Sequence, residues 1–324
     1  MPATALDAFT LEKLIGAAVA APSIHNTQPW RFRLDLGTLT LQMRAATDRA
    51  LRHTDPTGRA LHVSVGCALF NLRVAAAHFG WEPVPRLLPR PDQPDLLATV
   101  RLAGAVRTPA PMALYEALWR RHSSRLPFSD RALPTTVVTE LQDAARADGV
   151  DLHLVPPTDA GALLRLIGEA EHRNDADTDR AAESRRWVRA TYPAADGLLP
   201  DVVGPQDSLG RIPMRDFSAR RRPGAPTAVP FESHPHLLVL STDHDHRADW
   251  LRAGQALEHV LLVVTVHGVR ASLLHQALEW PDLRKRLVPP VGGGPRHAQM
   301  VIRAGCGPEG PASPRLPVPT PGPG

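Results

Sequence analysis

Apolar residues recur every three or four positions in several stretches of the chain, which is the spacing of one face of an α-helix. In the first third, this spacing and the alternation typical of strands predict helix 8–21, strand 31–34, strand 38–43 and helix 59–79. Pro22 and Gly80 stand at the ends of the two helices, and Gly37 stands at the turn between the strands. We therefore expect two helices around a β-hairpin.

The rest of the chain carries a similar mixture. Its pattern predicts helix 115–119, helix 135–147, strand 150–155, helix 159–172, strand 237–241, helix 249–268 and strand 299–303. Residues 191–230 are rich in Pro and Gly and follow neither period. An irregular segment of this length in a compact protein is typical of a lid or of an excursion from the domain. The elements together indicate an α+β protein.

The helix at 249–268 repeats the helix at 59–79 with a constant offset of 188 residues. The matching pairs are Gly66 and Gly254, Ala68 and Ala256, Leu69 and Leu257, and Gly80 and Gly268. Glycine inside a helix costs about 1 kcal/mol relative to alanine, so Gly66 and Gly254 indicate a close approach of backbones. A chance similarity between two helices rich in Ala, Leu and Val is the alternative.

This repeat suggests two tandem half-domains, residues 1–105 and 112–318, joined through 108–111 and followed by a proline-rich tail at 319–324. The chain has 324 residues, 43% of them hydrophobic, which suffices for such a pair with a proper core. A probable lid at 191–230 belongs to the second half.

The cysteine content and the absence of targeting patterns favour a cytoplasmic protein. Cys67 and Cys306 are the only cysteines, too few for a disulfide scaffold or a Cys-ligated zinc site. The first residues lack the basic and long apolar regions of a signal peptide. No apolar run approaches the roughly 20 residues that span a bilayer, so no membrane partner is expected.

The basic charge does not indicate a nucleic-acid partner. The net charge is +4, but the basic residues are spread along the whole chain and aromatic residues make up only 5%. A nucleic-acid surface needs a basic stripe with aromatic platforms beside it. Two histidine pairs, 234/236 and 244/246, are the best candidates for a metal site, and acidic caps at a helix start explain the second pair more simply. We predict no metal.

Two polar segments are not explained by secondary structure. Residues 22–30 form a proline-bounded loop that offers Ser, His, Asn, Thr and Gln side chains. Arg121, Ser123 and Arg125 alternate beside the end of a helix. Arginine forks with a hydroxyl suit a phosphate, and an amide-rich loop suits the edge of a flat heterocycle, so together they indicate a phosphorylated aromatic cofactor. The alternative is a loop capped for structural reasons and a surface arginine cluster.

These segments resemble a known family. APSIHNTQPWRF at 21–32 is similar to the P-S-x-x-N-x-Q-P-W signature of the nitroreductase superfamily, and RRHSSR at 120–125 is similar to its flavin-phosphate segment. Together with DPTGRALHVSVGCALFNLRVAAAHFG at 55–80 and ADWLRAGQALEHVLL at 248–262, they resemble the Acg family of nitroreductase-like flavoproteins. The resemblance runs from about residue 8 to 318 and is weakest at 191–230.

The resemblance implies an α+β nitroreductase fold of central, mostly antiparallel sheets flanked by helices, in which the two half-domains form a fused pseudo-dimer around one FMN. Each flavin-binding segment occurs once, in opposite halves, so a second flavin site should be absent or vestigial. The residues that match the family's cofactor-binding positions are Pro22, Ser23, Ile24, His25, Asn26, Arg121, Ser123, Arg125, Leu273, His275, Gln276 and Arg315. His275 departs from the family, which has a smaller or acidic residue there, so the ring edge is expected to differ.

Within this resemblance, Arg121, Ser123 and Arg315 match positions at the phosphate end, and Arg125 matches the cation beside the flavin N1 and O2 edge. The loop at 22–26 matches the segment that packs on the ring, and His275 and Gln276 match the turn facing N5 and O4.

The function implied is hydride transfer through flavin N5, with NAD(P)H or a small organic substrate as partner and no single essential catalytic side chain. The alternatives are a flavin-binding or storage protein with a closed lid and little turnover, and a degenerate scaffold that acts through protein contacts. The chain is expected to be a monomeric pseudo-dimer or a weak homodimer.

Overall fold

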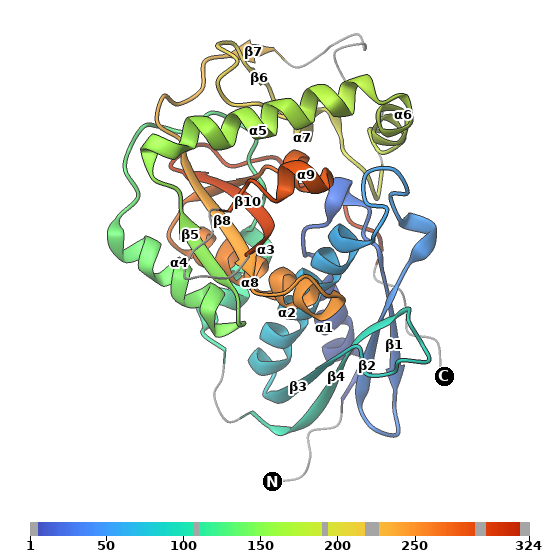
Figure 1. Ribbon diagram of the computed structural model, residues 1–324. Helices are drawn as coiled ribbons and strands as arrows, with labels where there is room; N and C mark the ends of the chain where they lie inside the picture. The colour runs from blue at the N-terminus through green and yellow to red at the C-terminus, as the bar shows by residue number, and fades with distance from the viewer. Residues whose placement is uncertain (1–5, 107–109, 190–193, 218–226, 289–295, 318–324) are drawn as a thin grey trace.

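The computed structural model describes residues 6–106, 110–189, 194–217, 227–288 and 296–317. Two four-stranded antiparallel sheets form its frame (Figure 1). The N-terminal sheet has the order β1-β2-β4-β3, from β1 (Trp30–Asp35), β2 (Thr40–Ala45), β3 (Trp81–Leu87) and β4 (Leu96–Ala105). The C-terminal sheet has the order β5-β8-β10-β9, from β5 (Asp151–Leu154), β8 (His236–Thr242), β9 (Arg270–Leu273) and β10 (His297–Gly305).

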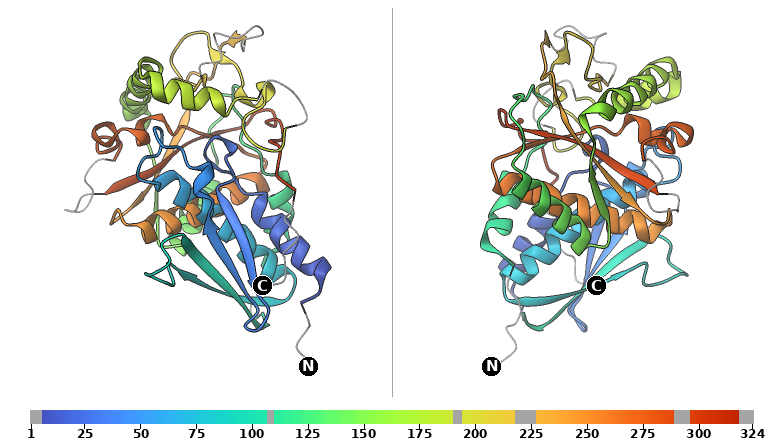
Figure 2. Two further views of the ribbon diagram at one scale, coloured as in Figure 1. Left: turned by 90° about the vertical axis from the view of Figure 1, so that its right-hand side faces the viewer. Right: turned by 60° about the vertical axis from the view of Figure 1, so that its left-hand side comes forward.

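Helices fill the space between and around the sheets (Figures 1 and 2). The longer ones are α1 (Ala8–Val19), α2 (Arg59–His78), α3 (Met112–Arg120), α4 (Thr135–Ala147), α5 (Pro157–Ala176), α6 (Thr178–Arg186) and α8 (Arg247–Val266). Short turns complete them at η1 (Ile24–Asn26), η2 (Thr47–Arg49), α7 (Pro200–Val203), η4 (Gln276–Glu279) and α9 (Pro281–Arg284). The predicted elements are all present, with ends that differ by a few residues; β3, β4, β9, α6 and the short turns were not predicted.

Helices α2 and α8 cross at the two glycines of the repeat. A Cβ atom on Gly66 would lie 2.3 Å from the carbonyl oxygen of Leu251 and 2.8 Å from the Cα of Gly254, and one on Gly254 would lie 2.1 Å from the oxygen of Val63. Real Cβ atoms do not come this close, so only glycine fits at either position. The close approach expected from the sequence is therefore the contact of these two helices with each other.

Burial explains the composition of α2. Nearly every residue from Arg59 to Ala77 is buried, so the helix is apolar on all sides instead of on one face. It is also the one helix of the described residues long and apolar enough to span a membrane, and 94% of that window lies inside the protein. The expectation that no apolar run reaches this length was therefore wrong, and core packing accounts for the run.

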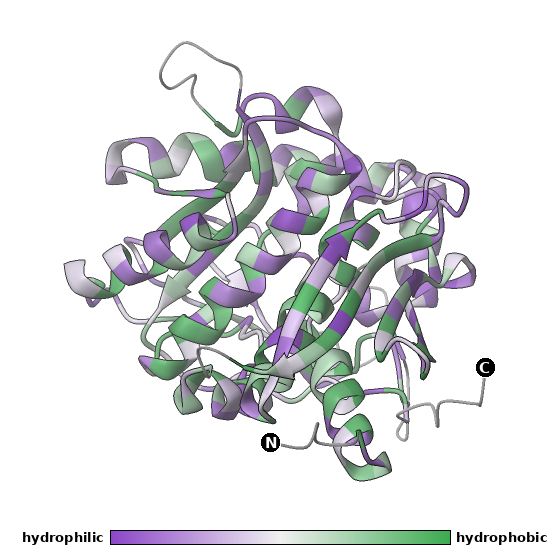
Figure 3. Ribbon diagram, turned by 90° about the horizontal axis from the view of Figure 1, so that it is seen from below, coloured by the Kyte–Doolittle hydropathy of each residue, from purple (hydrophilic) through white to green (hydrophobic). Residues whose placement is uncertain are grey.

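The N-terminal sheet shows the alternation expected of a sheet with one exposed face. In β1, Trp30 and Leu34 are buried while Arg31, Arg33 and Asp35 are exposed, and the mixed colours along the strands in Figure 3 follow this pattern. In contrast, β10 is buried along almost its whole length because the chain covers both faces of the C-terminal sheet.

The two sheets differ in one connection. Strands β1 and β2 are joined by residues 36–39, whereas β5 and β8, which pair in the same antiparallel way, are separated by residues 155–235. This insertion contains α5, α6, α7 and the short parallel pair β6 (Gln206–Asp207) and β7 (Ala228–Val229). The predicted lid at 191–230 is part of it; residues 191–193 and 218–226 lie outside the described residues, as does the predicted tail at 319–324.

Candidate flavin site

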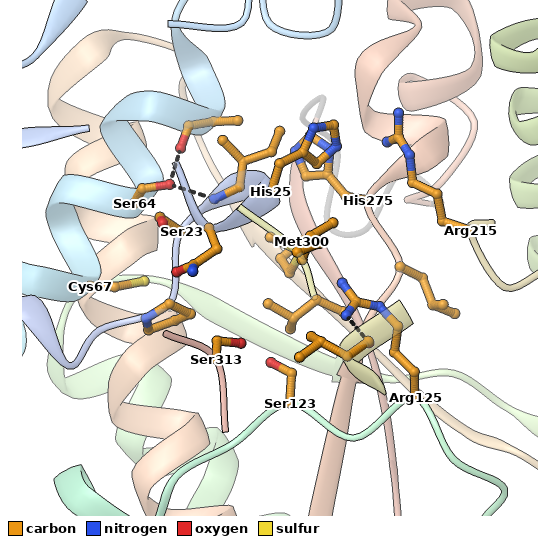
Figure 4. Close-up of a pocket in the computed structure, with 18 of the residues that line it drawn as sticks. Ser23, His25, Ser64, Cys67, Ser123, Arg125, Arg215, His275, Met300 and Ser313 are labelled. Atoms are coloured by element: carbon orange, nitrogen blue, oxygen red, sulfur yellow. Dashed lines mark hydrogen bonds between the residues drawn. The ribbon is translucent and has the colours of Figure 1, made fainter. Parts of the chain in front are cut away.

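A cavity of about 120 Å³ lies between the N-terminal loop, α2, the segment after α3, the turn after β9 and the insertion (Figure 4). All twelve residues predicted from the sequence line it: Pro22, Ser23, Ile24, His25, Asn26, Arg121, Ser123, Arg125, Leu273, His275, Gln276 and Arg315. Figure 4 shows Ser123 and Ser313 toward one end of the cavity, and His25 and His275 toward the other. The fold thus brings these twelve residues together from four segments that are far apart in sequence.

The loop at 22–28 is held in an uncommon backbone conformation. His25, Asn26 and Gln28 all have φ near +50°, where side chains other than glycine are rarely found. Ser23 Oγ accepts a hydrogen bond from the amide of Gln28 at 2.9 Å, and Ser64 Oγ on α2 accepts one from the amide of Ile24 at 3.2 Å. The loop is therefore a rigid part of the wall, fixed in part by a serine that the sequence analysis missed.

Asn26 bonds to the protein with all of its amide groups. Its Nδ2 donates to the carbonyl oxygens of Gly197 at 3.0 Å and Pro314 at 2.9 Å, and its Oδ1 accepts from Arg315 at 3.2 Å. The amide therefore ties the loop to the insertion and to the C-terminal segment. This geometry matches the structural alternative considered for the loop and leaves the amide no unused donor for a ligand.

Two guanidinium groups meet at the C-terminal end of α1. Nη2 of Arg121 and Nη2 of Arg315 both donate to the carbonyl oxygen of Ala20, at 3.2 and 2.9 Å. Arg121 is buried and Arg315 is half-buried, and among the described residues the Nε of each has no hydrogen-bond partner. Burial, followed by repulsion from Arg121, lowers the pKa of Arg315 to about 9, so it remains a cation at neutral pH.

One carboxylate faces these two cations. Glu258, on α8, lies 3.4 Å from Nε of Arg121, an ion contact without hydrogen-bond geometry, and its side chain is completely buried. The sequence analysis missed Glu258, and its only signal was an acidic residue in an otherwise apolar stretch. This end of the cavity therefore carries two positive charges against one negative charge, which suits an anion.

The other end of the cavity is closed by Phe217. The guanidinium carbons of Arg125 and Arg215 both lie 5.3 Å from the centre of its ring, and the ring of His25 meets it edge-on at 5.1 Å. Burial and the neighbouring Arg215 lower the pKa of Arg125 to about 10. Phe217 belongs to the insertion, so the predicted lid does reach the cavity.

Both ring nitrogens of His25 are buried without a hydrogen-bond partner. Burial and the charge of Arg215 hold the pKa of His25 well below its usual value, so the imidazole is neutral at physiological pH. A neutral imidazole offers one donor and one acceptor. His25 is thus the residue at this end with unused hydrogen-bonding capacity.

His275 is fixed by its neighbours as a neutral tautomer. Its Nε2 lies 2.9 Å from Nη2 of Arg59, which can only donate, so Nδ1 carries the proton and donates to Glu279 at 3.0 Å. Glu279 also pairs with Arg215 of the insertion. Burial opposes ionisation of Glu279, but Arg215 and the bond from His275 lower its pKa to about 2. This network links the turn after β9 to the lid.

Several hydrogen bonds hold the described part of the insertion over the cavity. Gln28 donates to Ala195 at 2.8 Å, Gln276 to Pro213 at 3.0 Å, and Arg125 to Val202 at 2.8 Å. A separate hydrophobic cluster packs beneath: Val188, Leu198, Leu199, Val202, Val203 and Phe217. The insertion therefore covers the cavity as an ordered, packed layer.

A wider groove of about 1230 Å³ lies on the outer side of the same strip of chain. It runs along α5 and is lined by residues 210–213 and 232–236, with none of the predicted site residues. Of the histidine pairs considered for metal, His246 caps α8 with Asp249 at 3.2 Å, as the simpler interpretation predicted.

The chain is similar to mycobacterial proteins over nearly its whole length. It is 32% identical to "Putative NAD(P)H nitroreductase Rv3131" of Mycobacterium tuberculosis, with 93% of this chain and 86% of that protein covered. It is 29% identical to "Putative NAD(P)H nitroreductase acg" of the same species, with 98% and 96% covered. The protein therefore belongs to the Acg family of the nitroreductase superfamily.

Among solved structures, a nitroreductase-like family protein from Bacillus cereus is 13% identical, covers 66% of this chain and 95% of its own, and has a TM-score of 0.39. A nitroreductase with bound FMN from Desulfitobacterium hafniense is 14% identical, covers 63% of this chain and 95% of its own, and has a TM-score of 0.38. No protein-family model matches the chain.

Proposed function

We propose that the protein is an FMN-binding oxidoreductase that transfers hydride between the flavin and NAD(P)H or a small organic substrate. One observation carries the proposal: Arg121, which is buried, and Arg315, which is half-buried, place two cations against one carboxylate beside a cavity lined by the family's cofactor-binding positions. An excess of positive charge in a largely buried site is costly, and a phosphate would supply negative charge there. The names of the relatives are in line with this function.

The residues fit the cofactor at the phosphate end. The unpartnered Nε groups of Arg121 and Arg315 are donors that a phosphate oxygen could accept from, and Ser123 and Ser313 line the same end. At the ring end, the cavity is small: an engineered cavity of about 150 Å³ holds a single benzene ring. The whole cavity has a volume of about 120 Å³, so a three-ring flavin requires that side chains such as Phe217 move outward.

In this proposal, Arg121, Arg315 and Ser123 hold the phosphate, the loop at 22–26 supports the ring, and His275 and Gln276 approach its reactive edge. FMN supplies the hydride acceptor and donor at its N5. The protein supplies position and exclusion of water, and Arg125 supplies positive charge where the reduced ring becomes negative. His25, neutral and unpartnered, offers one further donor at the ring end.

The second candidate function is flavin binding or storage with little turnover. The observation that favours it is the packed insertion, in which Phe217, Arg125 and Arg215 form one contact over the cavity. A lid that stays closed admits cofactor rarely and a second substrate not at all. The proposal includes one FMN per chain, bound between half-domains at 1–105 and 112–318, in a cytoplasmic monomer or weak homodimer.

The absorbance spectrum of the purified protein, before and after anaerobic NAD(P)H, tests the function. An oxidoreductase shows bound flavin that bleaches at a useful rate, and a storage protein shows bound flavin that does not. Phe217→Ala opens the lid contact, with exposed Leu209→Ala of the same insertion as control. If storage is correct, Phe217→Ala should raise the bleaching rate severalfold. Absence of flavin binding would contradict both functions.

A further inference from the structure

The buried carboxylate of Glu258 has no role in the cofactor contacts proposed above. Its side chain is fully buried on α8, in contact with Arg121 and outside the residues that line the cavity, and within the described residues neither of its oxygens has a hydrogen bond of full geometry. A buried acid without hydrogen-bond partners is expensive, so its presence beside an anion-binding site needs an account.

The charged and titratable groups around Glu258 come from three segments. Arg121, after α3, lies 3.4 Å away, and Arg315, in the C-terminal segment, attracts the carboxylate at longer range. On α2, the side chain of Asn71 interacts with Glu258, and the charge of Glu258 contributes to the raised pKa of the Cys67 thiol. The two arginines therefore stabilise the charged form of Glu258 in the free protein against the effect of burial, and the described residues of α2 add no cation to them.

A phosphate placed between the same arginines competes with Glu258 for both of them. The phosphate of FMN carries close to two negative charges above pH 7. Two cations would then face about three negative charges in a buried space, and like charges at this distance cannot all remain ionised. Among the described residues, no cation other than these two arginines acts on the carboxyl group of Glu258.

We propose that binding of FMN in this cavity is coupled to uptake of one proton by Glu258. The inference rests on the proposed function and names a regulation of the same site: affinity for the phosphorylated flavin rises as pH falls. The proton comes from solvent and adds to a carboxyl oxygen, no other bond changes, and the pocket then holds two positive against two negative charges.

The sign of the effect follows from the environment of the carboxyl group. Burial raises the pKa of Glu258, and Arg121 partly opposes this shift. When the phosphate engages Arg121, that opposition weakens and the pKa rises further. Between the pKa of the free protein and that of the complex, the complex holds one more proton, so the Kd for FMN increases up to tenfold per pH unit.

The test is calorimetric titration of the apo-protein with FMN at pH 7.5, in two buffers of different ionisation enthalpy. The difference in heat counts the protons taken up. We expect an uptake approaching one proton for FMN and none for riboflavin, which has no phosphate. Uptake by riboflavin equal to that by FMN, or no uptake with FMN, would overturn the proposal.

The variant Glu258→Gln keeps the shape and removes the titration, and the exposed Glu116→Gln on α3 is its matched control. We expect Glu258→Gln to abolish proton uptake and to make the Kd for FMN independent of pH between 7 and 8.5, whereas Glu116→Gln behaves as wild type. Retained uptake in Glu258→Gln would also overturn the proposal. The count on the unmodified protein stands even if the variant does not fold.

Failure of the proposed function gives a different result. If the wild-type protein binds neither FMN nor riboflavin, the function itself is wrong. If it binds FMN with no heat difference between buffers, the proposed FMN binding is supported and the proposed coupling to proton uptake is wrong.

Discussion

The N-terminal and C-terminal sheets have the same strand order, but the long connection lies at a different place in each sheet. Residues 20–29 form the site loop between α1 and β1, while the corresponding link between α4 and β5 is a tight turn at 148–150. Conversely, β1 and β2 are joined by a short turn, while β5 and β8 enclose the whole insertion. The loop that precedes the N-terminal sheet thus lines the cavity from one side, and the insertion within the C-terminal sheet lines it from another.

The interiors beside the α2 and α8 crossing differ in the same way. In the repeat with its offset of 188 residues, Phe70 corresponds to Glu258, and Asn71 corresponds to His259. Phe70 and His259 stack at 4.6 Å, and Arg73 and Asp148 pair beside them at 2.8 Å. Where one side of the crossing has a cavity with excess positive charge, the other is filled and neutralised. The comparison teaches that a repeated frame can carry a single site.

The largest expected effect is on the crossing itself. Gly254→Ala places a methyl group against the backbone of Val63 and should lower the free energy of unfolding by about 3 kcal/mol or more. Gly161→Ala, in α5, meets only the end of Arg165 at 3.5 Å and should raise it by up to about 1 kcal/mol. Denaturant unfolding measures both, and equal effects would show that the crossing is not a close backbone contact.

The next effect separates the anion end from the ring end. Arg121→Met combined with Glu258→Gln removes one cation without leaving a buried acid unpaired, and should raise the Kd for FMN by one to two decades. Riboflavin affinity should stay unchanged. Arg125→Met, the control cation at the other end, should alter the Kd for FMN by less than threefold and lower the flavin reduction potential. A similar loss of FMN affinity in both variants would contradict the assignment of the phosphate and the ring to different ends of the cavity.

Asn26→Leu tests the tie between loop and lid. The change removes three hydrogen bonds and leaves the carbonyl group of Gly197 without its donor, while Pro314 keeps its bond from Arg315, so the free energy of unfolding of the apo-protein should fall by about 1 to 3 kcal/mol. Limited proteolysis within 194–217 should become faster. If the stability of the apo-protein were unchanged and flavin binding were weaker, the amide of Asn26 would instead contact the cofactor, as the resemblance implies.

The smallest expected effect is on the pH dependence of stability, through the contact of Glu171 with the insertion. Glu171 accepts a hydrogen bond from the amide of Asp216 at 3.2 Å, and burial raises its pKa to about 7. Its contribution to stability is therefore complete below pH 4.5 and is lost as pH rises through about 7. Glu171→Gln should flatten this dependence, so the fall in Tm between pH 5 and 8 should shrink by about 2 °C. An identical fall in wild type and variant would exclude this linkage.

The frame could be predicted from the sequence because its signals are local. The helices that became α1, α2 and α8 show clear periodicity, and the glycine pair pointed to a contact that the structure contains. Strand β3 was missed because Pro83 and Pro85 argue against a strand. It tolerates them as the edge strand of its sheet, where an amide donor is dispensable.

The site was predicted in part. All twelve residues that the motifs and the resemblance singled out line one cavity, while their roles toward a cofactor stay predictions. Glu258 and Phe217 were missed for physical reasons. The first acts through charge against residues that only the fold brings near, and the second lies in a segment without periodicity, where its position depends on a backbone with φ of +53°.

The stoichiometry of bound FMN tests the central claim most directly. Because the loop and the arginine segment occur once each, and the opposite side of the crossing is filled by Phe70 and His259, one site per chain is expected. Saturating the apo-protein with FMN, removing the excess and comparing flavin absorbance with protein concentration gives the ratio. The account predicts one FMN per chain, and a ratio near two, or one FMN shared by two chains, would contradict it.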